Sequence, residues 1–170
     1  DFYAWSRLGD NEGKEWINYG ASNTSGLPMD EGKGYLYASQ EDRELTFLAN
    51  IRGNADAYPI NNMEYTVPTS GAMFTAWNLI GNSFACNVYL TNDRTNGSAL
   101  PFYKMNAEGN GFEAAIGTTI APMEGVFYEK PASTTSYQPW FTRTQPTRSS
   151  NINISLAQGS TAATIDNARS

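Results

Sequence analysis

Apolar and polar residues alternate along much of the chain, whereas the three- and four-residue spacing of an amphipathic helix is almost absent. The clearest alternation runs over 152–156, where isoleucine and leucine are separated by asparagine and serine. Residues 63–67 alternate in the same way. Eight further β-rich stretches are 15–19, 34–39, 44–48, 73–80, 86–90, 100–105, 125–129 and 136–142. The pattern predicts ten strands and an all-β, antiparallel fold.

Turn-forming residues separate the predicted strands. Runs of Gly, Asn, Asp and Glu occupy 9–13 and 108–111, and 92–97 is similarly rich in turn formers. The 8 prolines are spread along the chain and would interrupt a long helix. Short strands at spacings of about 8 to 15 residues indicate an antiparallel, jelly-roll-like β-sandwich. Because 170 residues suit one such domain, we expect residues 1–170 to form a single unit.

The composition argues against most protein-based catalysis and against several partners. The chain has no His, which is the usual general base near neutral pH and the usual partner of a nucleophilic Ser or Cys. Its net charge is −6 and its 11 Lys and Arg residues are scattered, so nucleic acid and anionic membranes would be repelled. No apolar run reaches the roughly 18 residues that a membrane helix requires. We therefore expect neither an enzyme, nor a nucleic-acid-binding protein, nor direct membrane insertion.

The polar residues indicate an extracellular or cell-surface location. Charged side chains make up only 16% of the chain, against about 25% in a typical soluble domain, and Asn, Ser, Thr, Gly and Tyr supply the remaining polarity. Cys86 has no second cysteine to pair with, and we expect it to be a buried, small apolar residue in a strand. The chain begins at Asp1 without a Met, so we expect it to be part of a longer, exported protein.

Three segments carry a family resemblance: EWINY at 15–19, EGKGYLYA at 31–38 and AWNLIGNSFACN at 76–87. They resemble a β-sandwich module that recurs toward the C-terminal ends of large secreted or surface proteins of the Bacteroidetes. Two later segments, IAPMEGVFY at 120–128 and IDNAR at 165–169, follow in the order of that module. The resemblance implies a β-sandwich that is covalently linked to neighbouring domains.

The chain departs from the module at two positions. Ser83 stands where the module usually has Pro, so the fixed φ of Pro is lost and we expect a looser turn. Ser170 replaces the apolar residue that would continue the last strand, and we expect the parent chain to continue beyond it.

The glycine-containing motifs have structural interpretations. Gly32-Lys33-Gly34 lacks the spacing and the following helix of a phosphate-binding loop, and its glycines favour a tight approach into the strand that follows. Trp77 is expected to pack between sheets. Asn82 is expected to hydrogen-bond the backbone of a turn.

The acidic residues leave two further chemistries open. A glycosidase needs two carboxylates held about 5–10 Å apart, and the spacing of the acids selects no such pair. The glutamates that could contribute are Glu15, Glu64, Glu113, Glu124 and Glu129. The loops at 10–12 and 92–96 supply oxygen ligands for a structural calcium ion, although turn chemistry explains both loops equally well. We expect no other cofactor.

The aromatic residues give the sharpest functional hypothesis. Aromatic rings stack on the apolar faces of sugar rings, while amides and carboxylates bind the hydroxyl groups. The candidate ligand-binding residues are Trp140, Tyr137, Gln138, Trp5, Trp16 and Tyr19, with Asn18 and Arg143 as nearby polar partners. The best cluster is 137–140, beside a Pro-rich stretch. We expect a non-catalytic module that binds or adheres to polysaccharide; the alternatives are a structural spacer without a ligand and a hydrolase with an acidic pair.

Overall fold

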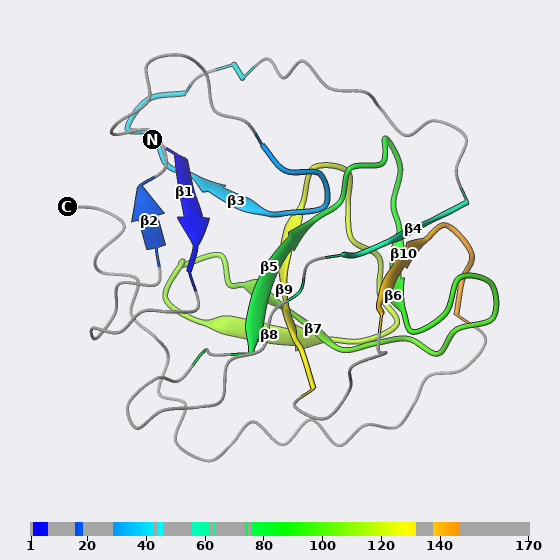
Figure 1. The fold of residues 1–170 in the computed structure, drawn as a ribbon. Coiled ribbons are helices and arrows are strands. Elements are labelled where there is room, and N and C mark those ends of the chain that lie inside the picture. Colours follow the sequence, from blue (N-terminus) through cyan, green and yellow to red (C-terminus); the bar gives the residue numbers. More distant parts are fainter. Residues whose placement is uncertain are drawn as a thin grey trace.

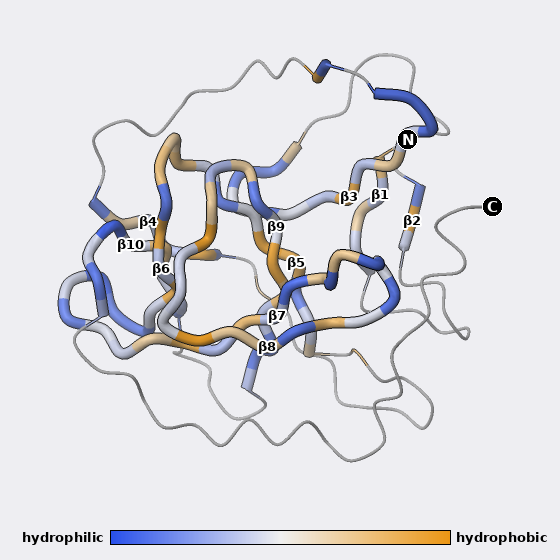
Figure 2. Tube along the Cα trace, turned by 180° about the vertical axis from the view of Figure 1, so that it is seen from behind, coloured by the Kyte–Doolittle hydropathy of each residue, from blue (hydrophilic) through white to orange (hydrophobic). Residues whose placement is uncertain are grey.

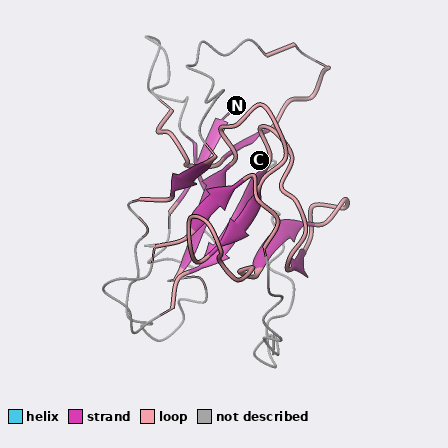
Figure 3. Cartoon of the chain, turned by 90° about the vertical axis from the view of Figure 1, so that its right-hand side faces the viewer, coloured by secondary structure: helices cyan, strands magenta, loops and turns pink. Residues whose placement is uncertain are grey.

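The computed structural model describes residues 2–6, 16–18, 29–42, 44–45, 56–61, 63, 74, 76–131 and 138–146. Within these ranges the chain forms ten strands and no helix (Figure 3). The strands are β1 (Phe2–Trp5), β2 (Trp16–Asn18), β3 (Tyr35–Tyr37), β4 (Ala57–Pro59), β5 (Trp77–Gly81), β6 (Tyr89–Thr91), β7 (Phe102–Met105), β8 (Phe112–Ala115), β9 (Gly125–Glu129) and β10 (Trp140–Thr142). All pairings between them are antiparallel. The all-β, antiparallel class predicted from the alternation is confirmed for the described residues.

The ten strands form three sheets (Figure 1). The four-stranded sheet has the order β5-β9-β7-β8, and its longest ladder pairs the whole of β5 with the whole of β9. One three-stranded sheet has the order β4-β10-β6, so strands far apart in the sequence become neighbours. The other has the order β2-β1-β3, and it adjoins the four-stranded sheet where Lys33 forms a bridge with Ile80.

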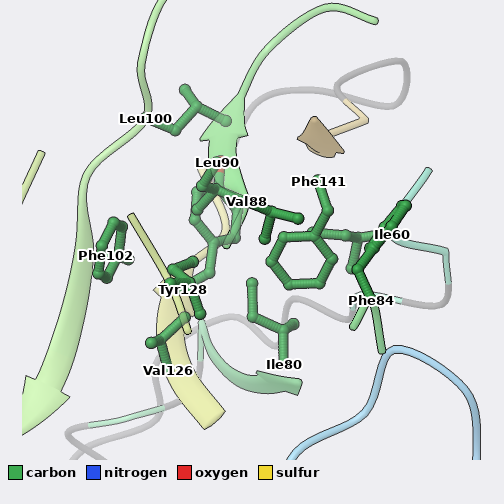
Figure 4. Close-up of a cluster of buried hydrophobic side chains, with 11 residues drawn as sticks. Ile60, Ile80, Phe84, Val88, Leu90, Leu100, Phe102, Val126, Tyr128 and Phe141 are labelled. Atoms are coloured by element: carbon green, nitrogen blue, oxygen red, sulfur yellow. The ribbon is translucent and has the colours of Figure 1, made fainter. Parts of the chain in front are cut away.

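The main hydrophobic core contains side chains from two of these sheets (Figure 4). Val126 and Tyr128 contribute from β9, where they alternate with Phe127 on the opposite face. Leu90 of β6 and Phe141 of β10 contribute from the sheet β4-β10-β6. The complete cluster is Ile60, Ile80, Phe84, Val88, Leu90, Leu100, Phe102, Ile120, Val126, Tyr128 and Phe141. Burial of this set fixes which face of each of these two sheets points inward.

Seven predicted strands overlap observed ones, namely β2, β3, β5, β6, β7, β9 and β10. Residues 44–45 and Met63, which belong to two other predicted strands, are not in strands, and 152–156 lies outside the described residues. Cys86 precedes β6 and is partly buried against the main core. The prediction missed β1, which has aromatic residues on both faces, β4, which ends in proline, and β8, which is rich in Ala and Glu.

The close approach expected at the glycines of 32–34 occurs against β5. The amide of Gly34 donates to the carbonyl of Leu79 at 2.9 Å, and the amide of Gly81 donates to the carbonyl of Gly32 at 3.0 Å. A Cβ on Gly34 would lie 2.6 Å from Cγ of Leu79. The GKGYLYA and WNLIGN motifs are therefore direct packing partners, and glycine is needed where their backbones meet.

Asn82 holds together the turn after β5, as its sequence position predicted. Its side chain is buried, and its Nδ2 atom lies within 3.0 Å of the carbonyl oxygens of Cys86, Ile120 and Ala121. Its Oδ1 atom accepts a hydrogen bond of 2.9 Å from the amide of Phe84. One side chain thus satisfies backbone groups of two segments that are about 40 residues apart in the sequence.

Candidate functional site

An aromatic cluster covers the second face of the four-stranded sheet. Trp77, Leu79, Tyr103 and Phe127 form its buried part, and Phe127 points away from the main core. The partly buried rings packed against it are Trp5, Trp16, Phe74 and Phe112. Most of the rings meet edge to face, while Trp77 and Tyr103 stack with their centroids 4.5 Å apart. These geometries are the favoured ones for aromatic packing, so the cluster stabilises the fold.

Trp5 and Trp16, two of the candidate sugar-binding residues, take part in this cluster. The ring of Trp5 packs edge to face on Trp16 at 5.0 Å and on Phe127 at 4.8 Å. Its indole N–H donates a 3.0 Å hydrogen bond to the carbonyl of Trp77. Because the polar atom and the ring of Trp5 already have protein partners, a packing role explains its position. Tyr19 and Tyr137 lie outside the described residues.

Tyr103 is expected to make the stability of this cluster depend on pH. Burial, and secondarily the negative charge of Glu129, raises the pKa of its hydroxyl above the ordinary value of 10.0. The neutral form is therefore favoured in the folded chain, and its contribution to stability is complete below about pH 10 and is lost as the pH rises through the raised pKa. We expect the free energy of unfolding to fall less steeply above pH 10 in Tyr103→Phe than in the wild type. Urea unfolding at several alkaline pH values measures how steeply the free energy of unfolding falls with pH in each protein. Equal slopes in Tyr103→Phe and the wild type would contradict a raised pKa of Tyr103.

Trp140 has a different environment on β10, the central strand of the sheet β4-β10-β6. Its neighbour Phe141 is completely buried in the main core, so the alternation of side chains puts Trp140 on the outer face of the sheet. There it lies directly opposite Pro59 of β4 and Thr91 of β6. The Trp140 side chain remains partly exposed. An aromatic ring thus lies partly exposed on the outer face of this sheet, where the neighbouring Thr91 and Thr142 are only 1% and 2% exposed.

An amide pair continues this outer face along the strand direction. Gln138 and Asn61 are each two residues beyond the opposed pair of Trp140 and Pro59, so the antiparallel register brings them opposite each other. Nε2 of Gln138 donates a hydrogen bond to Oδ1 of Asn61, and both residues are exposed. Alternate residues in a strand are separated by about 7 Å, so the amide pair lies about that far along the strand from the Trp140 position.

Tyr89 and the turn after β6 are further described neighbours of the Trp140 position. Tyr89 is partly exposed and lies opposite Thr142, which makes it a diagonal neighbour of Trp140 on the outer face. The turn at 92–97 follows β6 and is hydrophilic (Figure 2). We name the surface formed by Gln138, Asn61, Trp140, Pro59 and Tyr89 the Trp140 face.

Trp140 and Gln138 were candidates from the sequence, whereas the residues beside them in the structure were not predicted. Asn61 and Tyr89 lie about 50 to 80 residues earlier in the chain and reach the Trp140 face through strand pairing. Asn61 follows β4, a strand that the sequence pattern did not predict. The signal that could have found it is the Tyr-Pro pair at the end of a short edge strand, since proline is tolerated there.

The acidic candidates do not gather into a metal centre within the described residues. Glu124 accepts a 2.7 Å hydrogen bond from the amide of Ala121 and forms a 2.7 Å ion pair with Lys104. Oδ1 of Asp93 accepts hydrogen bonds from the amides of Thr95 and Asn96, which hold the pKa of its carboxyl below the ordinary value. In the described part of the chain, no group of three or more Cys, Asp and Glu side chains is arranged to hold a metal ion. The Asp93 loop is thus explained by turn chemistry.

Two of the five candidate glutamates, Glu113 and Glu129, are exposed. Glu15, Glu64 and the loop at 10–12 lie outside the described residues. Among the described residues there is no helix with the length and hydrophobicity that a membrane crossing requires.

Comparison with known proteins adds no relative to this picture. No protein-family model matches the chain, and neither the curated proteins nor the solved structures give a significant match. The geometry of the chain itself therefore carries the functional argument.

Proposed function

We propose that this chain is a non-catalytic module that binds polysaccharide through the Trp140 face, and that it acts at the cell surface or in the medium as part of a larger protein. The observation that carries the proposal is the position of Trp140, a partly exposed indole on the outer face of the central strand of its sheet. In this proposal the fold is a jelly-roll-like β-sandwich. The contribution of two sheets to one core supports that architecture.

The chemistry of the Trp140 face matches what a sugar chain presents. A pyranose ring has an apolar face of C–H groups, which packs on an aromatic ring, and a rim of hydroxyls, which donate and accept hydrogen bonds. Trp140 supplies the ring, and the amides of Gln138 and Asn61 supply both donors and acceptors. The resemblance to the Bacteroidetes module supports the exported, multidomain setting.

The rival function is a structural spacer without a ligand. The packing of Trp5, Trp16 and Trp77 in the aromatic cluster favours it, because three of the 4 tryptophans are then explained by stability alone. A spacer function does not explain why Trp140 is partly exposed and aligned with an amide pair. Binding measurements separate the two functions.

Affinity electrophoresis through gels containing xylan, β-glucan, mannan, pectin or starch tests the proposal. We expect at least one polysaccharide to retard the wild-type chain, and Trp140→Ala to weaken that affinity by about tenfold or more, since the stacking ring is lost. Ile17→Ala removes an apolar side chain that is 52% exposed on another sheet, and we expect it to bind like the wild type. Free migration of the wild type in every gel would favour the spacer.

A further inference from the structure

The turn at 92–97 covers Thr91, the residue of β6 that lies opposite Trp140. Thr91 lies opposite Trp140 on the outer face, yet it is only 1% exposed. Its Oγ1 atom donates a 2.8 Å hydrogen bond to the carbonyl of Asp93, and a Cβ on Gly97 would lie 2.9 Å from Cβ of Thr91. The turn that covers Thr91 therefore forms a wall beside Trp140. Figure 1 shows this turn extending beyond β6.

Internal hydrogen bonds fix the shape of this wall. Oδ1 of Asp93 accepts bonds from the amide of Thr95 at 2.9 Å and from the amide of Asn96 at 3.2 Å. Oδ1 of Asn92 accepts a 2.8 Å bond from the amide of Ser98. Gly97 packs against the backbone of Asp93, where a Cβ would lie 2.7 Å from the Asp93 nitrogen. Flattening the turn to admit a planar ligand would break these contacts.

The wall decides which form of polysaccharide fits. A crystalline polymer presents a flat surface, which would need several rings in one unobstructed plane. Beside Trp140 that plane is interrupted by the turn, whereas the direction along β10 leads to the amide pair of Gln138 and Asn61. A single chain can lie along β10 with one sugar on the indole and the next on the amides.

The charges around the Trp140 face decide the chemical class of the sugar. Among the described residues, Asp93 and Arg94 are exposed in the turn at one end of this face, and Asp56 and Arg143 are exposed at the other end, joined by a backbone hydrogen bond. The chain as a whole carries a net charge of −6. The described charges at the two ends are balanced in sign, and the net negative charge of the chain would repel a polymer of uronic acids or sulfated sugars.

We infer that the Trp140 face takes a single, uncharged polysaccharide chain in its soluble form, and that it takes neither crystalline polymer surfaces nor polyanionic glycans. This inference rests on the proposed function, which it makes more specific. The wall at 92–97 would clash with the flat surface of a crystalline polymer. The balanced charges around the Trp140 face would not attract a polyanionic glycan.

The test compares three kinds of probe with the 170-residue chain and its Trp140→Ala variant. The probes are soluble β-glucan and xylan, microcrystalline cellulose and chitin, and polygalacturonate and alginate. Soluble probes are measured by affinity electrophoresis and crystalline ones by sedimentation. The soluble binding is repeated at about 0.02 M and about 0.5 M NaCl, because an uncharged ligand should keep its affinity within about twofold when charges are screened.

Each result bears on a different claim. Trp140-dependent, salt-independent binding to a soluble neutral glycan, without binding to the other probes, supports the inference. Trp140-dependent binding to a crystalline or polyanionic probe overturns the inference and leaves the proposed function standing. The absence of Trp140-dependent binding to every probe overturns the proposed function and the inference with it. Trp140→Phe, which keeps a ring, and circular dichroism of each variant show whether a lost affinity reflects the ring or the fold.

Discussion

Replacing Gly81 with alanine is expected to lower the free energy of unfolding by roughly 2–4 kcal/mol, because the new methyl group has no space. A Cβ at this position would lie 2.8 Å from the carbonyl oxygen of Lys33 and 3.3 Å from its carbonyl carbon. Both atoms are backbone, so the start of the neighbouring strand must move. That movement also weakens the hydrogen bonds that join Gly81 to Gly32 and Gly34 to Leu79.

Gly125 provides the matched control for Gly81. The two glycines lie opposite each other in the ladder between β5 and β9, yet a Cβ on Gly125 would meet its nearest atom at 3.6 Å, an ordinary contact. We expect Gly125→Ala to change stability by no more than about 1 kcal/mol. Urea unfolding followed by tryptophan fluorescence measures both variants. Equal losses in the two would show that the junction of the GKGYLYA and WNLIGN motifs is not the close contact described above.

Asn82→Ala is expected to cost a similar amount, roughly 2–4 kcal/mol, through a different mechanism. The change leaves the buried amide of Phe84 without the acceptor that now lies 2.9 Å away. It also removes the donor that reaches the carbonyl oxygens of Cys86, Ile120 and Ala121. Asn82→Asp keeps the acceptor but turns a carboxylate oxygen toward these carbonyl oxygens, so we expect it to destabilise the chain at least as much.

The neighbouring residue supplies the control for Asn82. Ser83 also has a buried polar atom, but its Oγ has no hydrogen-bond partner among the residues that the structure describes. Removing that hydroxyl in Ser83→Ala is therefore expected to leave stability unchanged or to raise it by up to about 1 kcal/mol. Both variants are measured by chemical denaturation. A loss in Asn82→Ala that matches the effect of Ser83→Ala would refute the role given to the Asn82 hydrogen bonds.

Local sequence patterns predicted those strands and turns whose conformation is determined by residues close together in the sequence. β9 was predicted to its observed ends, because Val126 and Tyr128 supply the period-two burial that marks a strand. The turns at 92–97 and 108–111 followed from residues that favour turn geometry. The role of Asn82 was also predictable from the sequence, since an asparagine after a strand commonly forms hydrogen bonds with the backbone of a turn.

Long-range pairing explains what local patterns did not predict. β8 is a strand because β7 pairs with it, although Glu113 and Ala114 are weak strand formers and both are exposed. The partners of Trp140 come from β4 and β6, and nothing near residue 140 in the sequence indicates them. Trp5 and Trp140 are both tryptophans in strands, and the sequence around them does not distinguish them. Only the packing of the sheets shows that Trp5 belongs to the aromatic cluster and that Trp140 lies on the outer face of its sheet.

Titration calorimetry with the soluble polysaccharide that retards the chain most strongly tests the central claim, that the Trp140 face is the binding site. Wild type, Trp140→Ala, Trp140→Phe and Gln138→Ala are compared after each is shown to be folded. We expect the wild type to bind most tightly, Trp140→Phe and Gln138→Ala to bind a few-fold more weakly, and Trp140→Ala to lose about tenfold or more in affinity. Wild-type affinity in Trp140→Ala, or no heat of binding in the wild type, would contradict the claim.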